Sequence, residues 1–174
     1  MLNYRTKTYI AGDWEHDKDA IEILQTWNEN SRYGLSFSDA HKFKQARDSS
    51  LNCSIKRSLA DRLNISKTFV LIVGEYTAKL RAGSCQFCNS YNSWTGLCAR
   101  RYYVDFRSYI EYECEKAVAS NIKIIVLYNS LFVNKNKCPS LMRLKGIHIP
   151  MKKIVNGVVI WDYTSIKKAF DSIK

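Results

Sequence analysis

The stretch Thr68-Phe69-Val70-Leu71-Ile72-Val73 is almost continuously apolar, and Gly74-Glu75-Tyr76 follows it directly. A strand that carries apolar side chains on both of its faces suits the middle of a sheet that is covered on both sides. The stretch Ile122-Lys123-Ile124-Ile125-Val126-Leu127 has the same character. These two runs predict two strands in the core of the sheet.

Shorter β-favouring runs at 8–11, 33–37 and 147–149 predict three further strands. Helical spacing of apolar side chains predicts helices at 20–27, from an Asn52 cap to 63, at 110–118 and at 165–174. Strands that alternate with helices imply right-handed crossovers and a mostly parallel sheet. We therefore expect a three-layer α/β fold, flavodoxin-like, with a mostly parallel sheet flanked by helices.

The chain has the size and composition of one globular domain. It has 174 residues, 46% of them hydrophobic and 25% charged, with only two prolines and seven glycines. We expect a single domain over 1–174, interrupted by a polar, cysteine-containing insertion at 82–105. No apolar run reaches the roughly 20 residues that a membrane helix needs. Met1 to Arg5 has no signal-peptide character, so we expect a cytoplasmic protein whose six cysteines serve as thiols or metal ligands.

The formal net charge is +11, and no acidic residue lies between Lys116 and Asp162. Such a potential attracts phosphate groups of nucleotides, nucleic acids or lipids, although a solvated basic surface explains it equally well. The lysines of this half do not alternate with exposed aromatic residues, so nucleic acid is not the expected partner.

Ligands of open parallel sheets bind beyond the carboxyl ends of the strands. Four such corners are expected here: 11–13, 38–40, 74–76 and 128–129. The chain has no Walker sequence, no G-x-G-x-x-G and no H-E-x-x-H, so the usual phosphate loops and zinc-protease motif are absent. His148, between Ile147 and Ile149, is expected to face solvent or a sheet edge.

Three cysteines lie in the insertion: Cys85, Cys88 and Cys98. A C-x-x-C turn can direct two thiolates to one Zn²⁺, and a third ligand from the same loop is within easy reach. A structural zinc site, a redox or disulfide pair and plain thiols all remain open. Cys114 is expected in the core, because it lies on the apolar stripe of its helix.

The helix after the central strand carries Glu111, Glu113 and Glu115. Glu111 and Glu115 are four residues apart and share a face, and Glu113 follows Tyr109 by the same interval. A carboxylate beside an aromatic ring can have a shifted pKa, but spacing alone fits an ordinary hydrated surface just as well.

Several pieces in the same order resemble the TIR-like family of the Thoeris antiphage defence system. They are Tyr9-Ile10-Ala11-Gly12-Asp13, Phe37-Ser38-Asp39-Ala40, Ala46-Arg47-Asp48-Ser49-Ser50, Ile55-Lys56-Arg57 with Leu63, the stretch 66–77, 109–117 and Ile124-Ile125-Val126. The family carries an aromatic-x-x-x-Glu pattern whose glutamate is catalytic in NAD-cleaving members. Here that pattern is Tyr109 and Glu113, with tyrosine where tryptophan is more common. The insertion is a second departure from the family.

The resemblance implies an enzyme that cleaves NAD between nicotinamide and ribose. NAD would lie near Ala11, Gly12, Asp13, Asp39 and Tyr109, and Glu113 would stabilise the positive charge on the ribose. The product would be an ADP-ribose-derived nucleotide, linear or cyclic, that activates a separate effector protein. A phage-derived trigger and a homo-oligomer are further expected partners.

Two other classes of function remain open at this stage. One is a non-catalytic TIR-like interaction or adaptor module, because a fold does not fix a function. The other is a nucleic-acid-binding protein that uses its basic C-terminal half. Release of nicotinamide from NAD would separate the enzyme from both.

Overall fold

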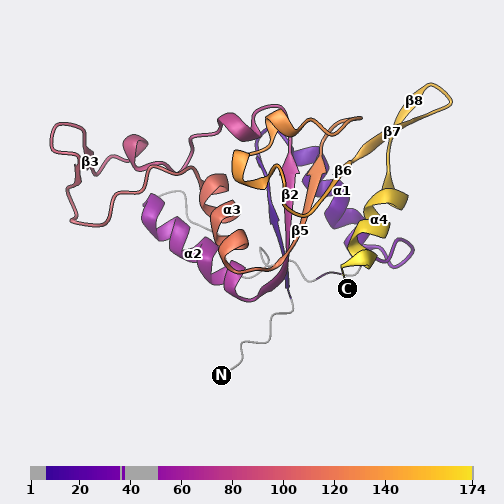
Figure 1. Ribbon diagram of the computed structural model, residues 1–174, viewed down its shortest axis with the longest axis horizontal. Helices are drawn as coiled ribbons and strands as arrows, with labels where there is room; N and C mark the ends of the chain where they lie inside the picture. The colour runs from indigo at the N-terminus through magenta and orange to yellow at the C-terminus, as the bar shows by residue number, and fades with distance from the viewer. Residues whose placement is uncertain (1–6, 36, 38–50, 174) are drawn as a thin grey trace.

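The computed structural model describes residues 7–35, 37 and 51–173 (Figure 1). Its centre is a four-stranded sheet with the order β1-β2-β5-β6. The strands are β1 (Lys7–Ala11), β2 (Ser66–Val73), β5 (Lys123–Tyr128) and β6 (Ile147–Pro150). Every neighbouring pair in this sheet is parallel. The predicted α/β class and the parallel sheet are therefore confirmed.

Helices cover both faces of the sheet (Figure 1). α1 (Lys18–Glu29) and α4 (Tyr163–Ser172) pack on one face, and α2 (Asn52–Asn64) and α3 (Tyr109–Ala119) pack on the other. Alternation along β2 explains both layers: Phe69 and Leu71 contact the α2 and α3 side, while Val70 faces the α1 and α4 side. Burial on both faces is the reason that this strand reads as a continuous apolar run.

The strand predicted at 33–37 is not formed: residues 33–35 and 37 have no strand structure. Leu35 is instead buried in the cluster beneath α1 and α4, and Tyr33 lies against Trp27 and Tyr163. The apolar pattern here serves side-chain packing rather than strand pairing. The predicted Asn52 cap is also displaced by one residue, because Leu51 is the N-cap and Asn52 begins α2.

Two small hairpins were not predicted. β3 (Tyr91–Asn92) pairs with β4 (Leu97–Cys98) inside the insertion, and β7 (Lys152–Val155) pairs with β8 (Val158–Trp161). Figure 1 shows both extending from the body of the domain on opposite sides. None of the helices in the described ranges is long and apolar enough to span a bilayer.

Candidate functional site

The carboxyl ends of β2 and β5 border a polar cavity of about 280 Å³, here called the strand-end cavity. The loop after β1 and the segment before Cys138 complete it. Its lining residues are His16, Asp17, Val73, Gly74, Glu75, Tyr76, Tyr128, Asn129, Ser130 and Lys137. The structure thus brings together the predicted corners at 74–76 and 128–129.

Asp13 organises the loop that follows β1. Its carboxylate accepts backbone N–H groups of Glu15 at 3.0 Å and His16 at 3.3 Å, and contacts His16 Nδ1 at 2.7 Å. The hydrogen bond to Asp13 raises the pKa of His16 above its ordinary value, against a smaller effect of desolvation. The His16 ring lies 4.8 Å from the ring of Tyr76. Asp13 therefore positions an imidazole and a phenol ring at the cavity.

Asp17 is the most deeply buried carboxylate of the strand-end cavity, with 3% of its surface exposed. Its Oδ1 accepts the amide of Asn129 at 2.9 Å, and no donor within the described ranges reaches Oδ2. Burial raises the pKa of this carboxyl group. A Cβ on Gly74 would lie 2.0 Å from Asp17 Oδ1, so the strand end accepts only glycine beside this carboxylate.

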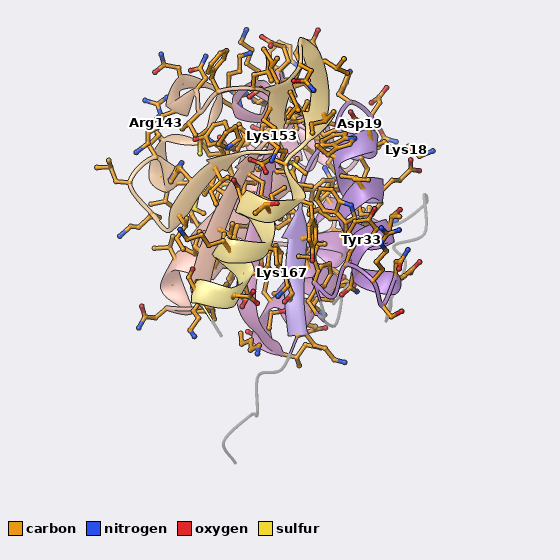
Figure 2. The ribbon with its side chains drawn as sticks, turned by 90° about the vertical axis from the view of Figure 1, so that its right-hand side faces the viewer. Lys18, Asp19, Tyr33, Arg143, Lys153 and Lys167 are labelled. Carbon is orange, nitrogen blue, oxygen red and sulfur yellow. The ribbon has the colours of Figure 1, made fainter. Side chains whose placement is uncertain are left out.

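The charged groups around this site lie at one end of the molecule. Figure 2 shows Lys18 and Asp19 at the start of α1, at the same end as Lys153 and Arg143 and away from Lys167. Lys152 Nζ lies 3.5 Å from Asp19 Oδ2, and Lys137 pairs with Glu75. The cavity is therefore lined by the acids Asp17 and Glu75 together with His16 and Lys137.

The other residues predicted near β1 have different surroundings. Ala11 is buried in the core, and a Cβ on Gly12 would lie 3.2 Å from Ile72 Cβ. Both contribute backbone at the strand end but do not line the cavity. Asp39 lies outside the described residues.

A larger cavity of about 520 Å³ lies beside α3. Glu111, Cys114 and Glu115 line one wall, and residues 138–141 with Arg143 line another. The predicted shared face of Glu111 and Glu115 is thereby confirmed. Both side chains have structural partners: Glu111 forms a capping box with Ser108, and Glu115 pairs with Arg107.

Glu113 points in a different direction from its two neighbours. It is 5% exposed, and its carboxylate accepts the hydroxyl of Tyr9, a fully buried residue of β1. It lines neither of the two cavities. The hydrated-surface interpretation does not apply to Glu113, because its side chain is held between α3 and the sheet.

Tyr109, the aromatic partner in the predicted pattern, is half-buried where three segments meet. Its hydroxyl donates to Asn52 Oδ1 at 2.9 Å, and its ring fills the space beside Gly83, whose φ is +94°. Desolvation, together with the nearby Cys88, Cys53 and Cys85, raises the pKa of Tyr109 to about 12. Tyr109 thus joins α2, α3 and the insertion, and it does not line the strand-end cavity.

The insertion cysteines do not form a metal site in this structure. Cys85 Sγ accepts the backbone N–H of Asp105 at 3.3 Å, and Cys98 lies opposite Tyr91 in the β3–β4 hairpin. All six cysteines are free thiols. Among the residues that are described, no three His, Cys, Asp or Glu side chains are grouped to hold a metal ion. The thiols as placed therefore do not fit zinc.

His148 lies on β6, an edge strand of the sheet, as one of the two predicted alternatives has it, and its side chain is half-buried. Its Nδ1 contacts the hydroxyl of Tyr128 at 2.9 Å, and Nε2 contacts the carbonyl of Lys145 at 3.0 Å. Burial lowers the pKa of His148 below its ordinary value.

Sequence reasoning missed His16 and Asp17 as cavity residues. Asn129 lies in a predicted corner, and Asp17 lies just before the helix that follows the first corner. The signal that could have found His16 and Asp17 was their spacing, three and four residues after Asp13. The turn that links β1 to α1 brings these two positions back to the strand ends.

Residues 9–83 match the family model described as Thoeris protein ThsB, TIR-like domain. Over these residues the chain is similar to that family. The TIR-like match begins in β1 and includes α1, α2 and β2, so it contains Asp13, Asp17 and Gly74. Tyr109 and Glu113 lie outside the matched residues. A comparison with curated proteins gives no match.

Proposed function

We propose that this TIR-like domain cleaves NAD at the nicotinamide–ribose bond and makes an ADP-ribose-derived signalling nucleotide, linear or cyclic, in antiphage defence. The observation that supports this proposal most is the Thoeris ThsB match across a segment that contributes to the strand-end cavity. Ligands of parallel α/β sheets bind at this edge.

The charges at the cavity suit two parts of NAD, the nicotinamide ring and the diphosphate. The oxidised nicotinamide ring is cationic, and Asp17 and Glu75 line the cavity. The diphosphate is anionic. Lys137 pairs with Glu75 at the cavity, and Lys152 pairs with Asp19 near the start of α1. A cation near carboxylates and an anion near ammonium groups are both favoured by Coulomb attraction.

The family resemblance assigns the reacting carboxylate to Glu113. Its role would be to stabilise the positive charge that develops on the ribose as the glycosidic bond breaks. Because Glu113 is 5% exposed and accepts the Tyr9 hydroxyl, contact with substrate requires α3 to move relative to β1. Asp17 is the alternative carboxylate, since it already borders the strand-end cavity.

The test measures nicotinamide released from NAD by the wild-type protein and by Glu113→Gln, Asp17→Asn and Glu115→Gln variants. Each protein is assayed with and without lysate from phage-infected cells. Glu115 lies on the same helix but is half-exposed and paired with Arg107, so its variant is the matched control. We expect Glu113→Gln to lose about 10²-fold or more in rate, and Glu115→Gln to keep its activity.

Each other result has a defined meaning. Loss in Asp17→Asn with activity retained in Glu113→Gln would move the catalytic role to the strand-end cavity. Absence of nicotinamide release from the wild type, with or without lysate, would reject the enzymatic proposal.

The proposed partners follow from this activity. NAD is a substrate rather than a resident cofactor, and the effector protein is reached through the nucleotide product. A phage-derived trigger and assembly of several copies would control when the reaction runs.

A non-catalytic interaction module is the second candidate. The β7–β8 hairpin supports it, because Ile154, Val155, Val158 and Val159 are exposed on a short hairpin that extends from the domain (Figure 1). Exposed apolar surface of this kind is typical of contact sites. Such a module would show no NAD turnover under any condition of the same assay.

A further inference from the structure

The segment 86–104, here called the aromatic arm, exposes several aromatic side chains to solvent. It contains β3 and β4 and extends from the body at the left of Figure 1. Trp94 is 97% exposed and Tyr103 is 90% exposed. Phe87 and Tyr102 are also exposed. Large aromatic rings are ordinarily buried for most of their surface, so this concentration indicates a surface that contacts a ligand.

The charge of the arm has one sign. No acidic residue occurs between Glu75 and Asp105, whereas Arg100 and Arg101 are both present and exposed. Within the described part of the chain, neither guanidinium has an ion-pair partner. Both charges are therefore available to an anion. The two arginines directly precede Tyr102 and Tyr103, so charge and flat apolar surface are adjacent.

Arg101 also adopts a left-handed backbone conformation, with φ of 59°. Glycine or asparagine takes this conformation at lower cost. A functional role of the guanidinium group would explain why an arginine occupies this strained position.

The base of the arm is fixed by hydrogen bonds. Cys85 N–H donates to the Asp105 carbonyl at 2.9 Å, and Asp105 N–H donates back to Cys85 Sγ at 3.3 Å. Ala99 N–H donates to the Ser90 carbonyl at 2.7 Å within the arm. The hairpin that carries Trp94 and the base of the arm are therefore held by backbone hydrogen bonds, which lowers the entropy lost on binding.

We propose that the aromatic arm binds single-stranded nucleic acid. Bases stack on aromatic rings without regard to sequence, and arginines attract the phosphate backbone. The arm offers both groups side by side, and its uniformly positive charge complements a polyanion. The apolar surface of the arm is largely aromatic rather than aliphatic, which suits flat bases better than the side chains of a protein interface. The inference is independent of NAD cleavage, because it concerns a surface distinct from both cavities.

Fluorescence anisotropy tests this proposal with the full chain. The probes are a labelled single-stranded oligodeoxythymidine, an oligouridine of equal length, and a DNA duplex of equal length. The variants are Trp94→Ala/Tyr103→Ala, which removes stacking, and Arg100→Ala/Arg101→Ala, which removes charge. The control for the aromatic variant is Phe132→Ala, at an aromatic residue outside the arm that is 75% exposed. The control for the arginine variant is Lys135→Ala/Lys145→Ala, which removes the same charge from the basic C-terminal half.

We expect both single strands to bind more tightly than the duplex. The aromatic double variant should bind at least about tenfold more weakly, since stacking one base contributes enough to give that factor. The arginine double variant should lower the salt slope by about 1.4, or about 0.7 for each lost phosphate contact. The controls should retain most of the affinity. Comparison of oligodeoxythymidine with oligouridine tells whether DNA or RNA is preferred.

Three results would overturn the proposal. Equal losses in the arm variants and the lysine control would show non-specific attraction to the whole basic surface. Tighter binding of the duplex would exclude stacking on unpaired bases. Binding of polyglutamate, with no binding of either single strand, would assign the arm to an acidic protein partner.

Discussion

At the scale of single residues, the hydrogen bond from Tyr9 to Glu113 ties the proposed reacting carboxylate to β1, an edge strand of the sheet. Both residues are buried, and the bond joins β1 to α3 across one face of the sheet. Removing a donor from a buried carboxylate costs more than the net contribution of an average hydrogen bond. This bond therefore stabilises the domain and limits access to Glu113.

Tyr9→Phe is expected to lower the free energy of unfolding by about 1–3 kcal/mol, because the buried carboxyl group of Glu113 loses the hydrogen bond from Tyr9. Urea denaturation measures the change. Tyr9→Phe combined with Glu113→Gln should show a smaller penalty than the sum of the two single variants. Additive penalties would show that the two side chains are not coupled.

Asp105 provides a pH-dependent contribution to stability. Burial acts to raise its pKa, but hydrogen bonds from Arg107 and the charge of Lys56 outweigh it and lower the pKa to about 2. A carboxyl group with a lowered pKa in the folded state stabilises the fold above its ordinary pKa. This contribution is lost as the pH falls from about 4 to about 2.

We expect the stability difference between wild type and Asp105→Asn to be largest near neutral pH and to shrink below about pH 4. Urea titrations at a series of pH values measure that difference directly. Lys18 pairs with Glu22 on the solvent-facing side of α1. Glu22→Gln is therefore the control, and we expect it to change the stability little at any pH. A difference that grows on acidification would contradict the assignment.

Residue types and spacing indicated only part of the site. Asp13 was predicted at the first strand end, and it organises the loop beside the cavity. Asp17 was not predicted, because its position at the cavity depends on the turn between β1 and α1 rather than on any spacing motif. The sequence could not show that Glu113 is buried. Glu111 and Glu115, two residues away on either side, are the same residue type but line a cavity.

At the scale of elements, the six cysteines have unequal access to solvent. Cys53, Cys88 and Cys98 are half-buried, whereas Cys85, Cys114 and Cys138 are buried. Desolvation also raises the pKa of Cys114 well above its ordinary value, and a thiol reacts as the thiolate. We therefore expect two classes of thiol in the native protein.

Titration with a thiol reagent should modify Cys53, Cys88 and Cys98 first and the other three only after denaturation. Metal analysis of the same sample should find no stoichiometric zinc, because the thiols are not grouped for it. Bound zinc, with Cys88 and Cys98 protected until a chelator is added, would restore the original hypothesis of a structural metal site.

The core elements were predictable because their patterns depend on burial by two layers. β2 and β5 are continuously apolar, and the helices carry one apolar stripe each. The segment 33–37 was wrongly predicted as a strand because its apolar residues alternate as they do in strands. In the structure, Tyr33 and Leu35 instead pack against side chains near α1 and α4. The β7–β8 hairpin was missed because its apolar residues are exposed, which reverses the usual relation between hydrophobicity and burial.

At the scale of the whole molecule, the domain divides into a body, whose first half lies within the match to the ThsB TIR-like family model, and an arm that lies outside that match. The ends of the arm meet at the hydrogen bonds between Cys85 and Asp105. Lys56 is buried and donates to the carbonyl of Arg107 at 2.6 Å, so the chain after the arm is held directly to α2. The arm is therefore attached through its base, and none of its residues belongs to either core cluster.

Replacing residues 87–103 by a short Gly/Ser linker is expected to leave the fold intact, with a change in Tm of less than about 5 °C. The reason is that the outer arm buries no core side chain, while Cys85, Asp105 and Lys56 remain in place. Circular dichroism measures the fold and the Tm. Nicotinamide release should persist, and binding of single-stranded nucleic acid should disappear. If the protein unfolds without the arm, the outer segment stabilises the body. If the protein folds but no longer cleaves NAD, the arm contributes to the substrate site.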